Sequence, residues 1–152
     1  MKVFIKFPTT GKIYVFKTNL ALKADQSVLV ETEQIIEEGI VVENPEVFED
    51  GLGQILRKAT HEDKKILNNL KNTARSFLDE AQKKVTRHGL SMQILDAELS
   101  FDEKKLTFYF AAPARIDFRS LVSDMVKHFG KLIRLQQVGS RDEAKFYGGF
   151  IT

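Results

Sequence analysis

The sequence predicts an α+β protein. A small, β-barrel-like sheet is expected first, followed by a ferredoxin-like domain with a long first helix. Three observations predict this class. Short β-branched and aromatic segments fill residues 1–44, a helical apolar period covers 62–88, and a strand–strand–helix–strand pattern covers 90–138.

The N-terminal part contains four short β segments separated by turn residues. They read "VFIKF", "KIYVFKT", "SVLVET" and "IEEGIVVEN", and we expect Gly39 in the last one to mark a turn or bulge. The next stretch, "PEVFEDGLG" at 45–53, is rich in proline, glycine and acids. We therefore predict a small β domain over 1–44, a linker over 45–53 and a ferredoxin-like α+β domain over 54–152.

The long helix has a clear start and a clear end. Thr60 is a good N-cap, and Asp63 three positions later completes a capping-box arrangement. Gly89 suits the left-handed position that ends a helix. Between them, one face is apolar at spacings of three and four residues: Ile66, Leu70, Ala74, Phe77, Ala81 and Val85. The pattern predicts a single helix over 62–88.

The remaining elements follow in regular order. Residues 90–101 alternate but change phase at Ile94-Leu95, which predicts a bulge, and 106–112 form the second strand of a hairpin. Asp117 is expected to cap a second helix that ends at Gly130, and 131–138 form the last strand. If 54–59 is also a strand of this sheet, the order is β-α-β-β-α-β. Without that strand, the order is α-β-β-α-β with three strands.

Composition excludes several kinds of chemistry. The chain has no cysteine, so disulfides, thiol catalysis and cysteine-held clusters are excluded, and we expect no cofactor. His61, His88 and His128 have no metal-ligand partner at helical or turn spacing, so no metal site is expected. No phosphate-binding loop or catalytic set is visible, which indicates a protein that is not an enzyme. No run is apolar enough for a membrane helix, and we expect a cytoplasmic protein.

The charge distribution and one face of the second predicted sheet permit nucleic-acid binding as an alternative function. Residues 60–152 carry 16 basic and 12 acidic side chains, whereas residues 1–59 carry 7 and 9. The alternation of the predicted strands places Tyr109, Arg134 and Gln136 on the open face of the second sheet, where RNA-recognition modules carry stacking aromatics. One aromatic is fewer than that mode normally uses, so a face that is solvated or covered by a partner is the competing interpretation.

Two polar segments are candidate binding residues. "ARIDFR" contains Arg115, Asp117 and Arg119, and "GSRDEAK" begins at Gly139. The first interpretation is structural: Asp117 caps its helix and pairs with an arginine, while 139–145 form a turn. The second interpretation is that both segments form a polar surface that recognises a partner.

These segments also carry a family resemblance. The stretch from "HGLSMQILDAELSF" through "LTFYF" and "ARIDFRSL" to "GSRDEAKFYGG" resembles the conserved domain of the bacterial YaaT/RicT-like family. The same domain occurs at the C-terminus of a yeast polymerase-suppressor protein. "TGKIYVF" and "VLVETEQIIEEGIVV" resemble the N-terminal sheet of the family. The family motif falls on these positions: Arg115, Asp117, Phe118, Arg119, Gly139, Arg141, Asp142, Glu143, Ala144, Lys145, Gly148 and Gly149.

The resemblance implies a cytoplasmic, non-enzymatic adaptor. Members of the family join small helical proteins in a complex that carries iron–sulfur clusters. That complex acts with an endoribonuclease in mRNA processing and turnover, and it affects sporulation. The motif positions are then expected to bind protein partners. In the family, a cysteine-rich region follows the double glycine. The present sequence has no cysteine, so cluster binding is not expected of it, and Ala112-Pro113-Ala114 replaces the more usual turn before the arginine.

Overall fold

The chain forms two compact units. The computed structural model describes residues 1–139. The first unit contains Met1–Asn69 and Ser100–Asp102, and the second contains Leu70–Leu99 and the chain from Glu103 onward. The boundary lies inside helix α1 (His61–Arg75). The predicted division into a small β domain over 1–44, a linker over 45–53 and a ferredoxin-like domain over 54–152 stays a prediction.

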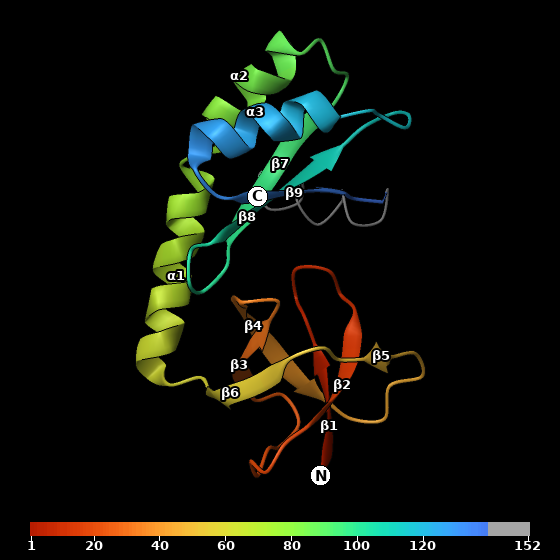
Figure 1. Cartoon of the computed structure of the whole chain (residues 1–152), viewed down its shortest axis with the longest axis vertical. Helices are drawn as coiled ribbons and strands as arrows, with labels where there is room; N and C mark the ends of the chain where they lie inside the picture. Colours follow the sequence, from red (N-terminus) through yellow and green to blue (C-terminus); the bar gives the residue numbers. More distant parts are fainter. Residues whose placement is uncertain (140–152) are drawn as a thin grey trace, which may run out of the picture. The chain divides into compact units, whose positions relative to one another are not determined.

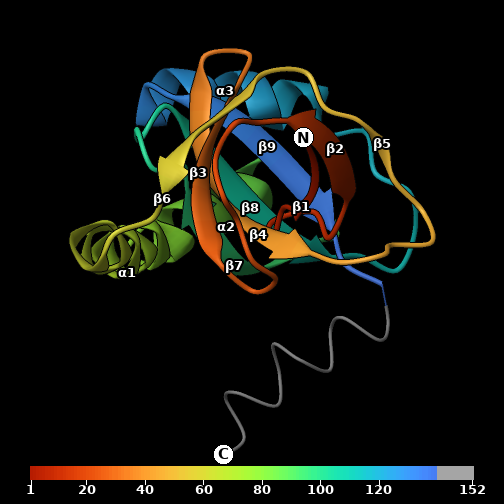
Figure 2. The same cartoon turned by 90° about the horizontal axis from the view of Figure 1, so that it is seen from below.

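The first unit is an open, six-stranded sheet (Figures 1 and 2). Its strands lie in the order β5-β2-β1-β4-β3-β6, and all neighbours are antiparallel except β2 and β5. No pairing between β5 and β6 closes the sheet within residues 1–139, so it is not a closed barrel. The strand bounds are β1 Lys2–Lys6, β2 Ile13–Lys17, β3 Ser27–Thr32, β4 Ile35–Val42, β5 Glu49–Asp50 and β6 Gln54–Lys58.

Alternating side chains form the core of this sheet. Those on one face are buried together: Ile5, Phe7, Phe16, Val28, Val30 and Val41. The prediction of a turn or bulge at Gly39 is wrong, because this residue lies inside β4 in regular register with Val28. A Cβ at position 39 would lie 2.3 Å from Cγ2 of Ile5. Glycine is therefore present so that the core can pack against the strand.

The segment 54–59 is a strand, but it belongs to the first sheet. β6 pairs antiparallel with β3, where Leu29 is opposite Arg57. The β-α-β-β-α-β order is therefore wrong in its first element. Sequence patterns indicate that a segment is extended, whereas its partner is whichever strand edge the tertiary fold places beside it.

The predicted capping box starts helix α1. The backbone N–H of Asp63 donates to Oγ1 of Thr60 at 3.1 Å, and the N–H of Thr60 donates to Oδ2 of Asp63 at 2.8 Å. The Arg57 guanidinium donates to both oxygens of the same carboxylate. The backbone N–H of Thr60 and the Arg57 side chain hold the pKa of Asp63 below its usual value.

The prediction of a single helix over 62–88 is wrong, because the helix is interrupted between α1 and α2 (Leu78–Arg87). At the break, the Ser76 hydroxyl donates to the carbonyl of Thr73 at 2.5 Å, and the N–H of Phe77 donates to the carbonyl of Ala74. These bonds tighten the last turn of α1. The Phe77 ring packs on Phe129, with centroids 5.3 Å apart. The apolar spacing of three residues from Ala74 to Phe77 fits both a continuous helix and this turn.

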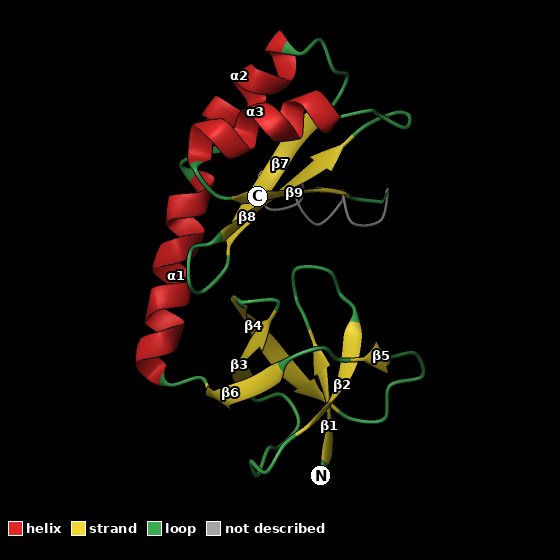
Figure 3. Cartoon of the chain, viewed as in Figure 1, coloured by secondary structure: helices red, strands yellow, loops and turns green. Residues whose placement is uncertain are grey.

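The second unit has a three-stranded sheet in the order β7-β8-β9, with β7 Gln93–Leu99, β8 Lys105–Ala111 and β9 Leu132–Gln137. β7 and β8 form the predicted antiparallel hairpin, and its register shifts between Ile94 and Asp96, which confirms the bulge. β9 is parallel to β8 after the crossover helix α3 (Arg119–Phe129). The α-β-β-α-β alternative is therefore the one observed, with its first helix split in two (Figure 3). The α+β class is confirmed.

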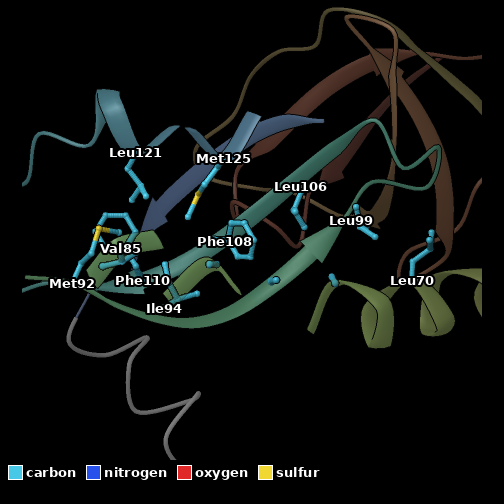
Figure 4. Packing of buried hydrophobic residues seen from close by; sticks show 13 residues of the cluster. Leu70, Val85, Met92, Ile94, Leu99, Leu106, Phe108, Phe110, Leu121 and Met125 are labelled. Carbon is cyan, nitrogen blue, oxygen red and sulfur yellow. The ribbon is translucent and has the colours of Figure 1, made fainter. Parts of the chain in front are cut away.

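Helices α2 and α3 cover one face of this sheet. Leu121 and Met125 of α3 and Val85 of α2 point toward Phe108 and Phe110 of β8 (Figure 4). The side chains of the first three are fully buried, as is that of Phe108. This packing fixes the helical layer on the strands and leaves the outer surfaces of α2 and α3 available for other contacts.

Candidate partner-binding surface

The segment 115–119 leads into α3, and its side chains alternate between exposed and half-buried positions. Arg115, Asp117 and Arg119 are exposed, whereas Ile116 and Phe118 are half-buried against the core. The Phe118 ring meets Phe110 edge-on at 5.9 Å. The two apolar side chains therefore anchor the segment, and the three charged ones point away from the core.

Asp117 and Arg119 form a paired unit. Nε and Nη2 of Arg119 donate to the two carboxylate oxygens of Asp117 at 3.0 and 2.8 Å. The backbone N–H of Arg119 donates to Oδ1 at 3.2 Å. The side chain of Arg119, followed by its backbone N–H, lowers the pKa of Asp117 to about 2. The carboxylate raises the pKa of Arg119 in turn. This geometry directs the exposed Arg119 guanidinium across the Asp117 carboxylate at the start of the helix.

The cap of α3 differs in detail from the prediction. The N-cap residue is Phe118, whose side chain makes no capping hydrogen bond, and Asp117 precedes it. Asp117 still accepts a hydrogen bond from the backbone N–H of Arg119, the first residue of the helix. It therefore satisfies a terminal donor of the helix from the position before the N-cap. Gly130 ends the helix in the left-handed conformation, as expected.

Arg115 adds a second cation to this surface. Within residues 1–139, no hydrogen bond or ion pair joins it to another side chain. Along α3, a shallow hollow begins at Arg119 and is lined by Arg119, Ser120, Ser123, Asp124 and Lys127. The entry segment and the first two turns of α3 thus form one polar, partly basic surface, which we name the α3 surface (Arg115, Asp117 and the hollow).

A polar seam that the sequence analysis missed joins α3 to α2. Nζ of Lys84 donates to Oδ1 of Asp124 at 2.9 Å, and Nε2 of His88 lies 3.0 Å from Oδ2. The contact with His88, followed by that with Lys84, lowers the pKa of Asp124 to about 2. Nε2 of His128 lies 2.8 Å from Oε2 of Glu80. The signal was present as spacings of four residues, at 80, 84 and 88 on one helix and at 124 and 128 on the other.

The residues predicted for nucleic-acid contact do share one face of the second sheet. Tyr109 is in register with Gln136, and Nη2 of Arg134 donates to Oε1 of Gln136 at 2.7 Å. The Tyr109 side chain is only 7% exposed and clusters with Leu95, Ala111 and Val138. Base stacking requires an accessible ring, so this ring would have to be uncovered first. A role of these residues in nucleic-acid binding stays a prediction.

The second family motif lies mostly outside the described residues. Gly139, at the end of the described chain, is exposed. The other motif positions are beyond it: Arg141, Asp142, Glu143, Ala144, Lys145, Gly148 and Gly149. Partner binding by the 115–119 and 139–149 motifs therefore stays a prediction.

The described residues show neither a metal site nor a membrane helix. Between Met1 and Gly139, no three His, Asp or Glu side chains are placed to hold a metal ion together. None of the helices α1 to α3 combines the length and apolarity needed to cross a membrane.

Comparison with known proteins identifies the family. The PSP1 C-terminal conserved region matches residues 53–138, which is more than half of the chain. The chain belongs to the PSP1 family. The matched region runs from β6 to the residue after β9, so it includes the α3 surface and the polar seam. This finding confirms the resemblance that the motifs at 115–119 and 139–149 predicted.

Relatives in the PSP1 family come from bacteria and fungi. The chain is 42% identical over 151 residues to the stage 0 sporulation protein YaaT of Bacillus subtilis, covering 95% of this chain and 55% of YaaT. It is 45% identical over 75 residues to an uncharacterized protein of Schizosaccharomyces pombe (49% of this chain, 10% of that protein). It is 33% identical over 87 residues to protein PSP1 of Saccharomyces cerevisiae (54% of this chain, 10% of that protein). The chain thus spans about half the length of YaaT and a tenth of each fungal protein. No solved structure matches it.

Proposed function

We propose that this chain is a cytoplasmic, non-enzymatic regulatory subunit. In this proposal it acts as an adaptor that holds protein partners together in bacterial mRNA processing and turnover. The partners would be small helical subunits and an endoribonuclease complex, as the YaaT-like resemblance implies. The name of its bacterial relative, a stage 0 sporulation protein, supports a role in regulation.

One structural observation carries the proposal. At the start of α3, the Arg119 guanidinium is held by two hydrogen bonds to Asp117, while Phe118 anchors the backbone against Phe110. A charged group that is already oriented loses less conformational entropy when it binds, so such groups suit recognition. The Asp117 carboxylate already accepts hydrogen bonds from the side chain and the backbone N–H of Arg119, so it is poorly suited to act as a general base, which favours binding over catalysis.

The test compares partner capture by matched variants. We expect Arg115→Ala/Arg119→Ala to lose partners that the wild-type chain captures, with quantitative mass spectrometry after cross-linking in cells as the measurement. Lys64→Ala/Lys71→Ala, which removes the same net charge from exposed positions on α1, is the control and should capture them normally. Both variants must keep the wild-type melting temperature. Undiminished capture by the arginine variant would contradict the proposal, as would an equal loss in the lysine variant.

Direct binding of RNA is the second candidate, because residues 60–152 carry four more basic than acidic side chains. Affinity for a structured RNA, measured over a salt series, separates the two functions. Direct phosphate contact predicts a steep fall in affinity as salt rises. An adaptor without RNA contacts predicts no binding even at low salt.

A further inference from the structure

The segment 43–52 of the first unit displays apolar side chains on an anchored backbone. Val47 is 80% exposed, Leu52 is 74% exposed and Phe48 is 46% exposed. Single exposed apolar residues are common, but three within six residues of one segment mark a candidate interaction surface. We name this segment the acidic loop, because it also contains Glu43, Glu46, Glu49 and Asp50.

The backbone of the acidic loop is held in place by the sheet. β5 pairs in parallel with β2, with Tyr14 opposite Glu49, and the N–H of Gly51 donates to the carbonyl of Val15 at 2.9 Å. A Cβ on Gly51 would lie 2.5 Å from the Phe16 ring, so this approach to the core requires glycine. Figures 1 and 2 both show β5 at the edge of the sheet beside β2. The exposed side chains therefore extend from a fixed support.

Phe48 links the loop to an apolar strip on the outer face of the sheet. Its ring meets the ring of Phe4 at 4.8 Å in an edge-on arrangement. Phe4 is in register with Val15 and Val42, and all three are half-buried on the face opposite the core residue Ile5. The exposed part of Phe48 thus continues an apolar surface that already covers the centre of the sheet.

Charge determines which partner suits this surface. The four acids of the loop are exposed, and none of them forms an ion pair with another residue of the described chain. The sequence has no lysine or arginine between Lys23 and Arg57. Nucleic acid and anionic lipid would be repelled by such a segment, whereas a basic partner would be attracted.

We propose that the acidic loop is a docking surface for a basic, amphipathic segment of another protein. The apolar side chains of Val47, Phe48 and Leu52 would contact the apolar face of that segment, and the surrounding carboxylates would pair with its lysines or arginines. The proposal does not depend on the α3 surface, which belongs to the second unit.

The test uses synthetic peptides of defined charge with the whole chain. The probe is a fluorescent helical peptide of about 18 residues with leucine on one face and lysine on the other. The matched control replaces every lysine with glutamate. We expect the lysine peptide alone to bind in fluorescence anisotropy at low salt. We also expect its NMR chemical-shift changes to concentrate in 43–52 and the adjoining strand β2.

Variants then test the individual contacts. Val47→Ser/Leu52→Ser should weaken binding of the lysine peptide by about tenfold or more, since it removes two apolar contacts and leaves the charge of the loop unchanged. Glu46→Gln/Glu49→Gln should weaken binding and reduce its dependence on salt. Leu132→Ser, which changes a leucine that is 58% exposed on β9, is the control and should bind the lysine peptide normally. Because all substituted side chains are exposed, circular dichroism should show a folded chain throughout.

Several results would overturn the proposal. They are equal binding of the glutamate peptide, chemical shifts that map outside the acidic loop, and wild-type affinity in the Val47/Leu52 variant. Loss of self-association in that variant, measured by analytical ultracentrifugation without peptide, would instead show that a second copy of the chain occupies the surface. Partner capture by the Arg115/Arg119 variant is measured independently of peptide binding. A negative result for the acidic loop therefore does not contradict the proposed adaptor function.

Discussion

Phe108 is the buried residue of β8 whose loss should most weaken the packing of helix α3 on the sheet. Its side chain is fully buried on β8, and its ring lies 5.6 Å from the ring of Phe129, at the end of α3. Phe108→Ala loses about 1.5–3 kcal/mol of transfer free energy. The cavity left behind raises the expected loss of unfolding free energy to about 3–5 kcal/mol. That is a large part of the roughly 5–15 kcal/mol that stabilises a typical domain.

Urea unfolding followed by far-UV circular dichroism measures this loss, because the helices of the second unit dominate the signal. Hydrogen exchange at the amides of β8 then shows whether the second unit opens before the first. Leu132→Ala, on the neighbouring strand β9 but 58% exposed, is the control and should change stability by about 0.5 kcal/mol or less. A loss below about 1 kcal/mol for Phe108→Ala would refute the packing argument, as would equal losses in the two variants.

Two further predictions concern backbone geometry and pH. Gly53→Ala should destabilise the first unit more than Gly11→Ala does in urea unfolding. Both residues have positive φ, but only at position 53 would a Cβ meet an atom, the Glu31 carbonyl oxygen at 2.0 Å. The pKa of Asp124 is lowered to about 2, so its contribution to stability is complete above about pH 4 and disappears as pH falls through about 2. Asp124→Asn should therefore lower the melting temperature clearly at pH 6 and much less at pH 2. An equal effect at both pH values would show that the ion pairs with Lys84 and His88 are not its source.

The α3 surface was partly predictable. The alternation in "ARIDFR" already suggested charged residues on one side and apolar ones on the other, and the Asp117–Arg119 pair is a contact between near neighbours. The seam of Asp124 with Lys84 and His88 joins residues 36 to 40 positions apart, so it depends on how α2 and α3 pack. Spacing along one helix shows which side chains share a face, but it does not show which face of another helix they meet.

Local chemistry is what the sequence by itself determined about this protein. The capping box of Thr60 and Asp63, the bulge at Ile94-Leu95 and the glycine that ends α3 each depend on residues a few positions apart. Only the tertiary structure decided that β6 pairs with β3 and that the helix is interrupted at Ser76. The physical reason is the same in both cases. A strand edge or a helix end satisfies its hydrogen bonds with whatever partner the folded chain brings near, and several partners suit the same local sequence.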